Sequence, residues 1–421
     1  MDTIKQIIDK YNNTSLILRI ICGLVIGAVL GLLHGGLPVI PLLGTLFVGA
    51  LKGIAPILVL CLVVSALAQG NEGLDSRFRL VICLYMISTF LASVIATVLS
   101  FVFPQTIKLS TVAQAESIPD NLGDVLQNLL TGMVANPIDA LLQGRYIGVL
   151  FWAVVMGISA NKVASDNTKK WMSDISEIIS LVVRWIINMA PFGIMGLVYE
   201  NVATNGLSIF TDYGKLLLLL VSCMLLVALV VDPFIAWLVL RTNPYPLVFR
   251  CLKESGLTAF FTRSSAANIP VNMELCRKLG MDKEMYAISI PLGATINMDG
   301  AAVTIAVMSI AAANTSGIQI PLTTALALSF IATLGACGAS GVAGGSLLLI
   351  PMACSLFGVD QDTAMQVVAV GFILGVVQDS VETALNSAGD VMFAATAEYA
   401  QWKKDGKSLP EFLGGTTKLP E

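Results

Sequence analysis

The sequence predicts an all-α polytopic membrane protein, with eight transmembrane helices and two re-entrant helical hairpins. Of its 421 residues, 56% are hydrophobic and only 12% are charged, whereas soluble domains carry about 25% charged residues. Apolar runs of about 20 residues, long enough to cross a bilayer, recur along the chain. The first run follows a long polar start without a small-residue cleavage site, so we expect a retained helix and not a signal peptide.

Eight apolar runs are predicted to span the membrane. They lie near residues 16–33, 42–68, 80–103, 122–160, 175–200, 214–240, 286–313 and 363–397. The fourth run is long for a single span, and we expect it to break at Asn136 and Pro137 and again near Gly144, because proline and glycine interrupt helices.

Two further apolar stretches, 247–276 and 321–357, contain Gly, Ser and Pro near their middles. We predict that each enters the membrane and returns, since irregular backbone at that depth is tolerated where protein or water surrounds it. With the N-terminus inside, Lys108 is then the only basic residue in the outer loops. The positive-inside rule therefore predicts that both termini are cytoplasmic.

A weak internal repeat relates the two hairpins. In the first copy, Arg263, Ser264 and Ser265 precede a helix that is expected to break at the Asn-Met-Asp-Gly sequence of residues 297–300. In the second copy, the small residues of 340–346 precede a helix that is expected to end at 386–390. Interrupted apolar segments at matching positions of two repeats point to the binding site of a transporter.

The last apolar run carries polar residues on one helical face. These are Gln378, Asp379, Glu382, Thr383, Asn386 and Asp390. A carboxylate at the bilayer centre costs about 2.5–3.5 kcal/mol on insertion scales, so three of them require cations opposite. We therefore predict an ion or substrate pathway, in which Asp379 is suited to bind an ammonium group and Arg263 to neutralise Asp379 or Glu382.

Three other places offer ligands, each with a structural alternative. The break at Asn297 and Asp299 favours an oxygen cage for a small cation, or else these side chains join neighbouring helices. The tips at 264–265 and 344–346 present N–H groups to a carboxylate, or else their small residues allow close packing. A weaker signal comes from three oxygens on one face of the third run, those of Tyr85, Ser88 and Thr89, because such hydroxyls usually bond their own helix. Asp232 has no assigned role.

Four motifs, in order and at suitable spacing, resemble the sodium:dicarboxylate symporter family of glutamate and aspartate transporters. They are residues 262–265, 297–300, 341–346 and 379–390. The resemblance implies a homotrimer in the bacterial inner membrane, in which a scaffold holds a transport domain that slides like an elevator. The scaffold would comprise 1–68 and 122–200, the transport domain 80–103 and 214–397, and a cytoplasmic tail 398–421.

The resemblance also implies roles for single residues. The substrate carboxylate would be held by Ser265 and by the backbone of Val342, Ala343, Gly344 and Gly345. Asp379 would bind the amino group, with Thr383 and Asn386 beside it. Sodium ions would be the coupling ions. One sodium site would be lined by Asn297, Asn386 and Asp390, and another by Tyr85, Ser88, Thr89, Asn297 and Asp299.

Departures from the family pattern bear on the substrate. Glu382 stands where members with acidic substrates have an Arg, and Ala301 where they have a Thr. Because Glu382 repels a substrate carboxylate, we expect a sodium-coupled symporter of small neutral amino acids, serine and threonine. The alternatives are a sodium- or proton-coupled carrier of acidic amino acids or C4-dicarboxylates, and a passive cation channel. An enzyme is not expected, since there is one His and no G-x-S-x-G motif.

Overall fold

The computed structural model describes residues 14, 16–33, 39–69, 76–109, 131, 133–143, 146–206, 209–337, 339 and 344–419. Throughout these ranges the regular structure is helical, and β-structure is limited to an isolated bridge between Pro410 and Thr417. The predicted all-α class is therefore confirmed. Two predicted site residues, Val342 and Ala343, lie outside the described residues, as does Gly144.

The first half of the chain forms seven described helices. They are α2 (Leu16–Leu32), α3 (Val39–Ala68), α4 (Ser76–Val102), α6 (Pro137–Leu142), α7 (Tyr146–Val163), α8 (Asp166–Asn188) and α9 (Ala190–Asn205). The predicted break at Asn136 and Pro137 is confirmed: the Asn136 side chain caps α6 by accepting the Ile138 N–H at 2.9 Å. The span predicted near 175–200 contains a bend of 50°, where α8 meets α9. Pro191 follows this bend and lacks the N–H that would continue the ladder of α8.

The second half begins with α10 (Ile209–Leu226), the π-helix η2 (Val227–Val231) and α11 (Asp232–Leu240). The first predicted hairpin then has two arms. One arm is α12 (Tyr245–Cys251), the π-helix η3 (Leu252–Gly256) and α13 (Leu257–Thr262), and the other is α14 (Ser265–Lys278). The remaining elements are α15 (Lys283–Ile296), α16 (Asp299–Thr315), α17 (Leu322–Ala336), η4 (Ser346–Leu349), α18 (Ile350–Ser355), α19 (Gln361–Lys404) and η5 (Glu411–Leu413).

Of the two predicted helix breaks, the structure contains the first and lacks the second. Asn297 and Met298 leave the helical conformation, with φ and ψ of −90° and 80° and of −122° and 53°, and Asp299 already begins α16. α19 runs without interruption from Gln361 to Lys404, so it covers the predicted span 363–397, and the end expected at 386–390 in the second copy of the repeat is wrong. The Asn386 side chain accepts a hydrogen bond from the Gly300 N–H at 2.7 Å, so it does not compete for the backbone of its own helix.

Several helices have the length and composition of membrane spans. Among the described residues, four stretches qualify, and the bent pair α8 and α9 makes a fifth if it is one span. The four are Arg77–Val102, Phe210–Leu240, Lys283–Thr315 and Gln361–Lys404. The chain is thus a multi-pass membrane protein by these features, while eight spans with two re-entrant hairpins stay a prediction.

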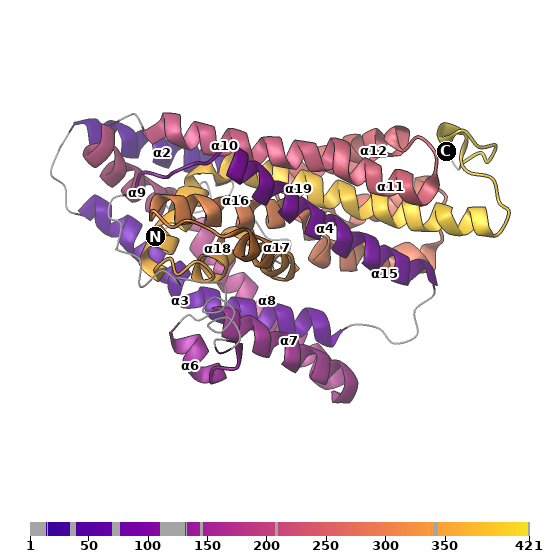
Figure 1. Ribbon diagram of the computed structural model, residues 1–421, viewed down its shortest axis with the longest axis horizontal. Helices are drawn as coiled ribbons and strands as arrows, with labels where there is room; N and C mark the ends of the chain where they lie inside the picture. Colours follow the sequence, from indigo (N-terminus) through magenta and orange to yellow (C-terminus); the bar gives the residue numbers. More distant parts are fainter. Residues whose placement is uncertain are drawn as a thin grey trace, which may run out of the picture.

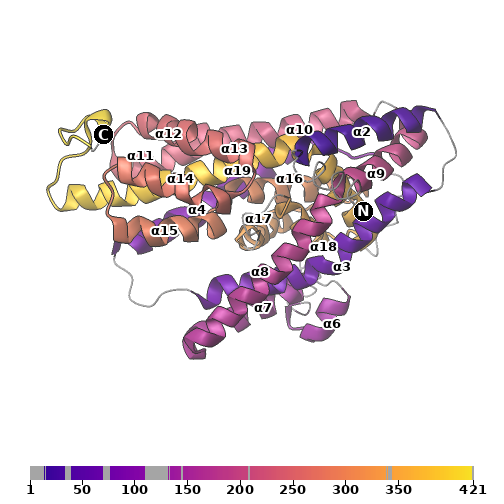
Figure 2. The same ribbon diagram turned by 180° about the vertical axis from the view of Figure 1, so that it is seen from behind.

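The helices pack in two groups. α2, α3, α7, α8 and α9 pack mainly on one another, and α3, α7 and α8 lie together along one side of the molecule in both views (Figures 1 and 2). In the other group α16 packs against α4, α17, α18 and α19, and all its residues from Asp299 to Ala313 are buried. The polar face of α19 therefore lies inside the second group, beside the break between α15 and α16.

Candidate functional site

The turn between α13 and α14, at the tip of the first predicted hairpin, directs the Arg263 side chain into the protein. Arg263 ends α13 in the left-handed conformation, with φ 51° and ψ 35°, and the Ser264 hydroxyl caps α14 by accepting the Ala267 N–H at 3.2 Å. This turn buries the Arg263 side chain and brings its Nε to 3.2 Å from Oδ2 of Asp379. The expected pairing of Arg263 with Asp379 is therefore present. Ser265, the first residue of α14, is buried at the same tip.

Asp379 also contacts Gly344, which lies in the second predicted hairpin. Its Oδ1 accepts the N–H of Gly344 at 3.2 Å, and Gly344 has φ +74°, which only glycine adopts readily. One carboxylate of α19 thus contacts both Arg263, between α13 and α14, and Gly344, just before η4. The Thr383 hydroxyl donates to the Asp379 carbonyl at 2.7 Å within the same helix, and Gly345 is buried next to Gly344.

Glu382 faces α16 and Ser346, the first residue of η4. Its Oε2 accepts hydrogen bonds from Thr304 at 2.7 Å, Ser346 at 2.9 Å and Gln378 at 2.5 Å. The first turn of α16 lies so close that a Cβ on Gly300 would stand 2.8 Å from the Cα of Glu382. Sequence reasoning missed Thr304 and Ser346 as partners of this carboxylate, because each is a single small hydroxyl residue in an apolar or glycine-rich run.

Ala301, the other predicted specificity residue, is fully buried in the first turn of α16. It directly follows Gly300, which contacts the backbone of Glu382. The two positions that depart from the family pattern therefore lie at one helix crossing.

The structure brings together the residues of the first predicted cation site. Asn297 Nδ2 donates to Asp390 Oδ1 at 3.1 Å and to the Asn386 carbonyl at 3.2 Å. A Cβ on Gly389 would stand 2.7 Å from this Nδ2, so the missing side chain permits the contact. Among the described residues, the buried Asn297 Oδ1 and Asp390 Oδ2 have no hydrogen-bond partner. Two such oxygens beside an unwound backbone fit a hard cation.

The second predicted cation site is only partly brought together. Both Asp299 oxygens lie at hydrogen-bond distance from a hydroxyl, Oδ2 at 2.6 Å from that of Ser88 and Oδ1 at 2.7 Å from that of Thr89. The predicted grouping of Tyr85 with them is not seen, since its hydroxyl donates to the Asp390 carbonyl at 2.9 Å and so belongs with the first site. A Cβ on Gly293 would stand 2.8 Å from the Tyr85 hydroxyl and 2.7 Å from Asp390 Oδ1, so that glycine leaves room for both.

Asp232 is the acidic residue for which the sequence predicted no role. Its Oδ1 lies 2.8 Å from the Ser88 hydroxyl, which also lies 2.6 Å from Oδ2 of Asp299. The signal was available, since a carboxylate within an apolar span is by default a candidate for function.

Acidic side chains outnumber basic ones in this site. Its buried carboxyl groups are those of Asp232, Asp299, Asp379, Glu382 and Asp390. Within the described ranges, Arg263 is the one basic side chain that pairs with any of them. Within those ranges, no three His, Cys, Asp or Glu side chains are placed together so that they could hold a metal ion.

Comparison with known proteins places this arrangement in a family. A model of the sodium:dicarboxylate symporter family matches residues 16–399. A Bifidobacterium adolescentis protein named serine/threonine transporter SstT is 61% identical over 410 residues, which are 97% of this chain and 95% of that protein. Proteins of the same name from Streptococcus thermophilus and Streptococcus agalactiae are 55% and 54% identical over 401 residues, 95% of this chain and 100% of each. The chain therefore belongs to the sodium:dicarboxylate symporter family, a family of transporters and not of enzymes.

Proposed function

We propose that this protein imports serine and threonine together with sodium ions. The observation that carries the proposal is the group of five buried carboxyl groups with one paired arginine, beside the break at Asn297 and Met298. Negative charge at this depth requires cations before the site can cross the bilayer. The relatives named as serine/threonine transporters support the choice of substrate.

The substrate would bind between the two hairpin tips. Its ammonium group would take the place of Arg263 at Asp379, and its carboxylate would accept hydrogen bonds from the tip residues Ser264 and Ser265 and from the backbone of 342–345. Thr383 and Asn386 lie on the same face of α19 as Asp379. The contact of Asp379 with both tips supports this placement.

Sodium would bind at the two oxygen-rich places beside the break. The first would use Asn297, Asn386 and Asp390, with the neighbouring Tyr85. The second would use Ser88, Thr89 and Asp299. The unpartnered oxygens of Asn297 and Asp390 support the first site, and the short contacts of Asp299 with two hydroxyls support the second.

We further propose an elevator mechanism in a homotrimer of the bacterial inner membrane, with eight spans, two re-entrant hairpins and both termini in the cytoplasm. The scaffold would be 1–68 with 122–200, and the moving part 80–103 with 214–397. The separate packing of α2, α3 and α7 to α9 supports this division.

Uptake of serine is expected to require an inward sodium gradient. The measurement is accumulation of labelled serine in proteoliposomes, with sodium or choline outside, and with a proton gradient imposed in both cases. Equal uptake in choline and sodium would rule out sodium coupling and favour a proton-coupled carrier. Ion flux without saturable serine uptake would indicate the channel alternative.

Replacing Glu382 by Gln is expected to admit aspartate. The amide oxygen of Gln still accepts from Thr304, Ser346 and Gln378, while the negative charge that repels a substrate carboxylate is removed. We expect unlabelled aspartate to compete with labelled serine at least about tenfold better than in the wild type, a change of about 1.4 kcal/mol.

Glu382→Arg serves as the contrasting variant. An arginine cannot accept these three hydrogen bonds, so we expect uptake to be lost and not converted to aspartate transport, even when Ala301 is replaced by Thr. If aspartate at low concentration already blocks serine uptake in the wild type, the chain is instead a carrier of acidic substrates.

A further inference from the structure

Asp232 is built into the interior without a cationic partner. Its side chain is 2% exposed, and among the described residues it forms no ion pair. The π-helix η2 ends directly before it and Pro233 follows it. Short π-helical turns within α-helices cost stability and are frequent at functional sites, so the backbone around Asp232 indicates a role beyond packing.

The hydrogen bonds of Ser88 define that role. Its oxygen lies 2.8 Å from Asp232 Oδ1 and 2.6 Å from Asp299 Oδ2, but a hydroxyl has a single proton to donate. If the proton points to Asp299, it occupies the space between Ser88 and Asp299 where an ion would be shared. If it points to Asp232, the Ser88 lone pairs face Asp299 and are available to a cation.

We propose that Asp232 is a positioning residue of the cation site, because it accepts the Ser88 proton and so turns the Ser88 oxygen toward an ion shared with Thr89 and Asp299. This inference rests on the proposed sodium coupling and on the proposed second sodium site. Asp232 itself does not touch the ion. It acts through Ser88, whose single proton can be donated to only one of the two carboxylates, Asp232 or Asp299.

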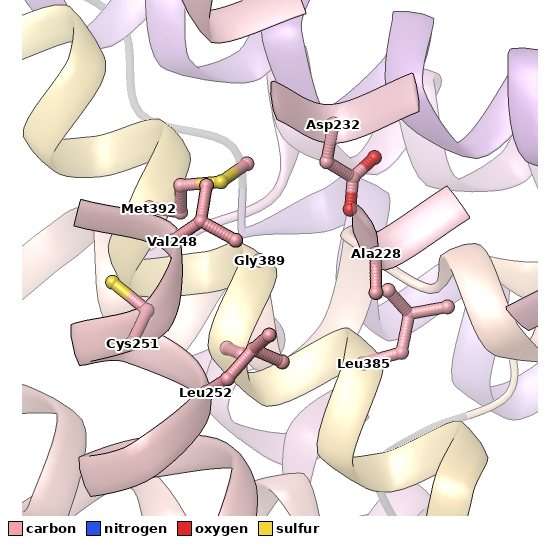
Figure 3. A pocket seen from close by; sticks show the side chains of 9 residues that line it. Ala228, Asp232, Val248, Cys251, Leu252, Leu385, Gly389 and Met392 are labelled. Carbon is pink, nitrogen blue, oxygen red and sulfur yellow. The ribbon is translucent and has the colours of Figure 1, made fainter. Parts of the chain in front are cut away.

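A small cavity beside Asp232 supports the assignment (Figure 3). It has room for about one water-sized molecule. Its other lining residues are Ala228, Val248, Cys251, Leu252, Leu385, Ala388, Gly389 and Met392. None of these side chains offers a hydroxyl, amide or ammonium group, so the Ser88 hydroxyl is the hydrogen-bond donor that the protein provides to Asp232 within the described residues.

The test is a double-mutant cycle read out by the sodium dependence of serine uptake. The variants are Asp232→Leu, which removes the acceptor and keeps a branched but larger side chain, Asp232→Asn, which keeps an acceptor oxygen, Ser88→Ala, and Ser88→Ala combined with each change at 232. Initial rates in proteoliposomes are measured against sodium at saturating serine, and against serine at saturating sodium.

We expect Asp232→Leu to raise the sodium concentration for half-maximal uptake about tenfold and Asp232→Asn only about threefold. The apparent KM for serine at saturating sodium should stay unchanged. In the Ser88→Ala background, neither change at 232 should raise the sodium requirement further, since the hydroxyl that Asp232 turns is already absent.

Three results would overturn the proposal. An unchanged sodium curve in Asp232→Leu would show that Asp232 does not serve the cation site. Effects that add to those of Ser88→Ala would show that it does not act through Ser88, and equal effects of Leu and Asn would assign its role to charge. If Asp232→Leu does not fold, the cycle of Asp232→Asn with Ser88→Ala decides by the same criteria. A wild-type curve that does not depend on sodium would instead refute the proposed function itself.

Discussion

Replacing Asp379 by Asn is expected to weaken serine binding at least tenfold and to abolish uptake, while the protein still folds and inserts. The ammonium group of the substrate would lose a hydrogen bond to a charged partner, which is worth about 1.5–3 kcal/mol. Titration calorimetry of the detergent-solubilised protein with serine, in saturating sodium, measures the change directly.

This substitution also leaves the buried Arg263 without its carboxylate, which lies 3.2 Å from Nε in the structure. An uncompensated buried charge destabilises a protein by itself. The double variant Arg263→Gln with Asp379→Asn therefore separates the two effects: it should recover stability and still not bind serine. Asp405→Asn, at the exposed end of the same helix, is the matched control and should bind normally. Serine affinity near the wild-type value in Asp379→Asn would assign Asp379 a structural role.

Replacing Asp390 by Asn is expected to raise the sodium concentration for half-maximal uptake at least tenfold. The Asn oxygen can still accept from Asn297, as Oδ1 of Asp390 does at 3.1 Å. The amide nitrogen would then replace Oδ2, one of the two unpartnered oxygens that face the proposed ion, and a nitrogen that carries two protons repels a cation. Uptake measured against sodium concentration, with lithium and potassium in parallel, gives the shift.

The control for this prediction is Glu398→Gln, two helical turns further along α19. Glu398 bonds Arg77 at 3.2 Å and Trp402 at 3.0 Å, away from the break at Asn297. Its replacement should leave the sodium curve in place. A sodium requirement that does not change in Asp390→Asn would remove Asp390 from the ion pathway and leave it as a link between α15 and α19.

The sequence allowed the polar face of α19 and the break at Asn297 to be predicted, because each rests on a local rule. A period of 3.6 residues places Asp379 and Asp390 on one face, and Asn next to Gly weakens a helix. Arg263 was expected to pair with Asp379 or Glu382, because it is the only basic residue near the breaks of the predicted hairpins, and the structure pairs it with Asp379.

What could not be predicted depends on contacts between distant segments. Asn386 and Gly389 look like a helix end in sequence, but the first accepts the Gly300 N–H and the second makes room for Asn297, so α19 continues. The partners of Tyr85 and Asp232 likewise follow from how α4 meets α11, α15 and α19, which no local pattern encodes.

The bond between Arg263 and Asp379 has a consequence for the electrical work of the transport cycle. This internal pair is neutral, and serine, a zwitterion, adds no net charge when it binds. Moving one elementary charge through the membrane potential changes the energy by about 2.3 kcal/mol per 100 mV. In the proposed cycle the membrane voltage would therefore act through the sodium ions and the carboxylates of Asp232, Asp299, Glu382 and Asp390, and the amino acid would add no net charge.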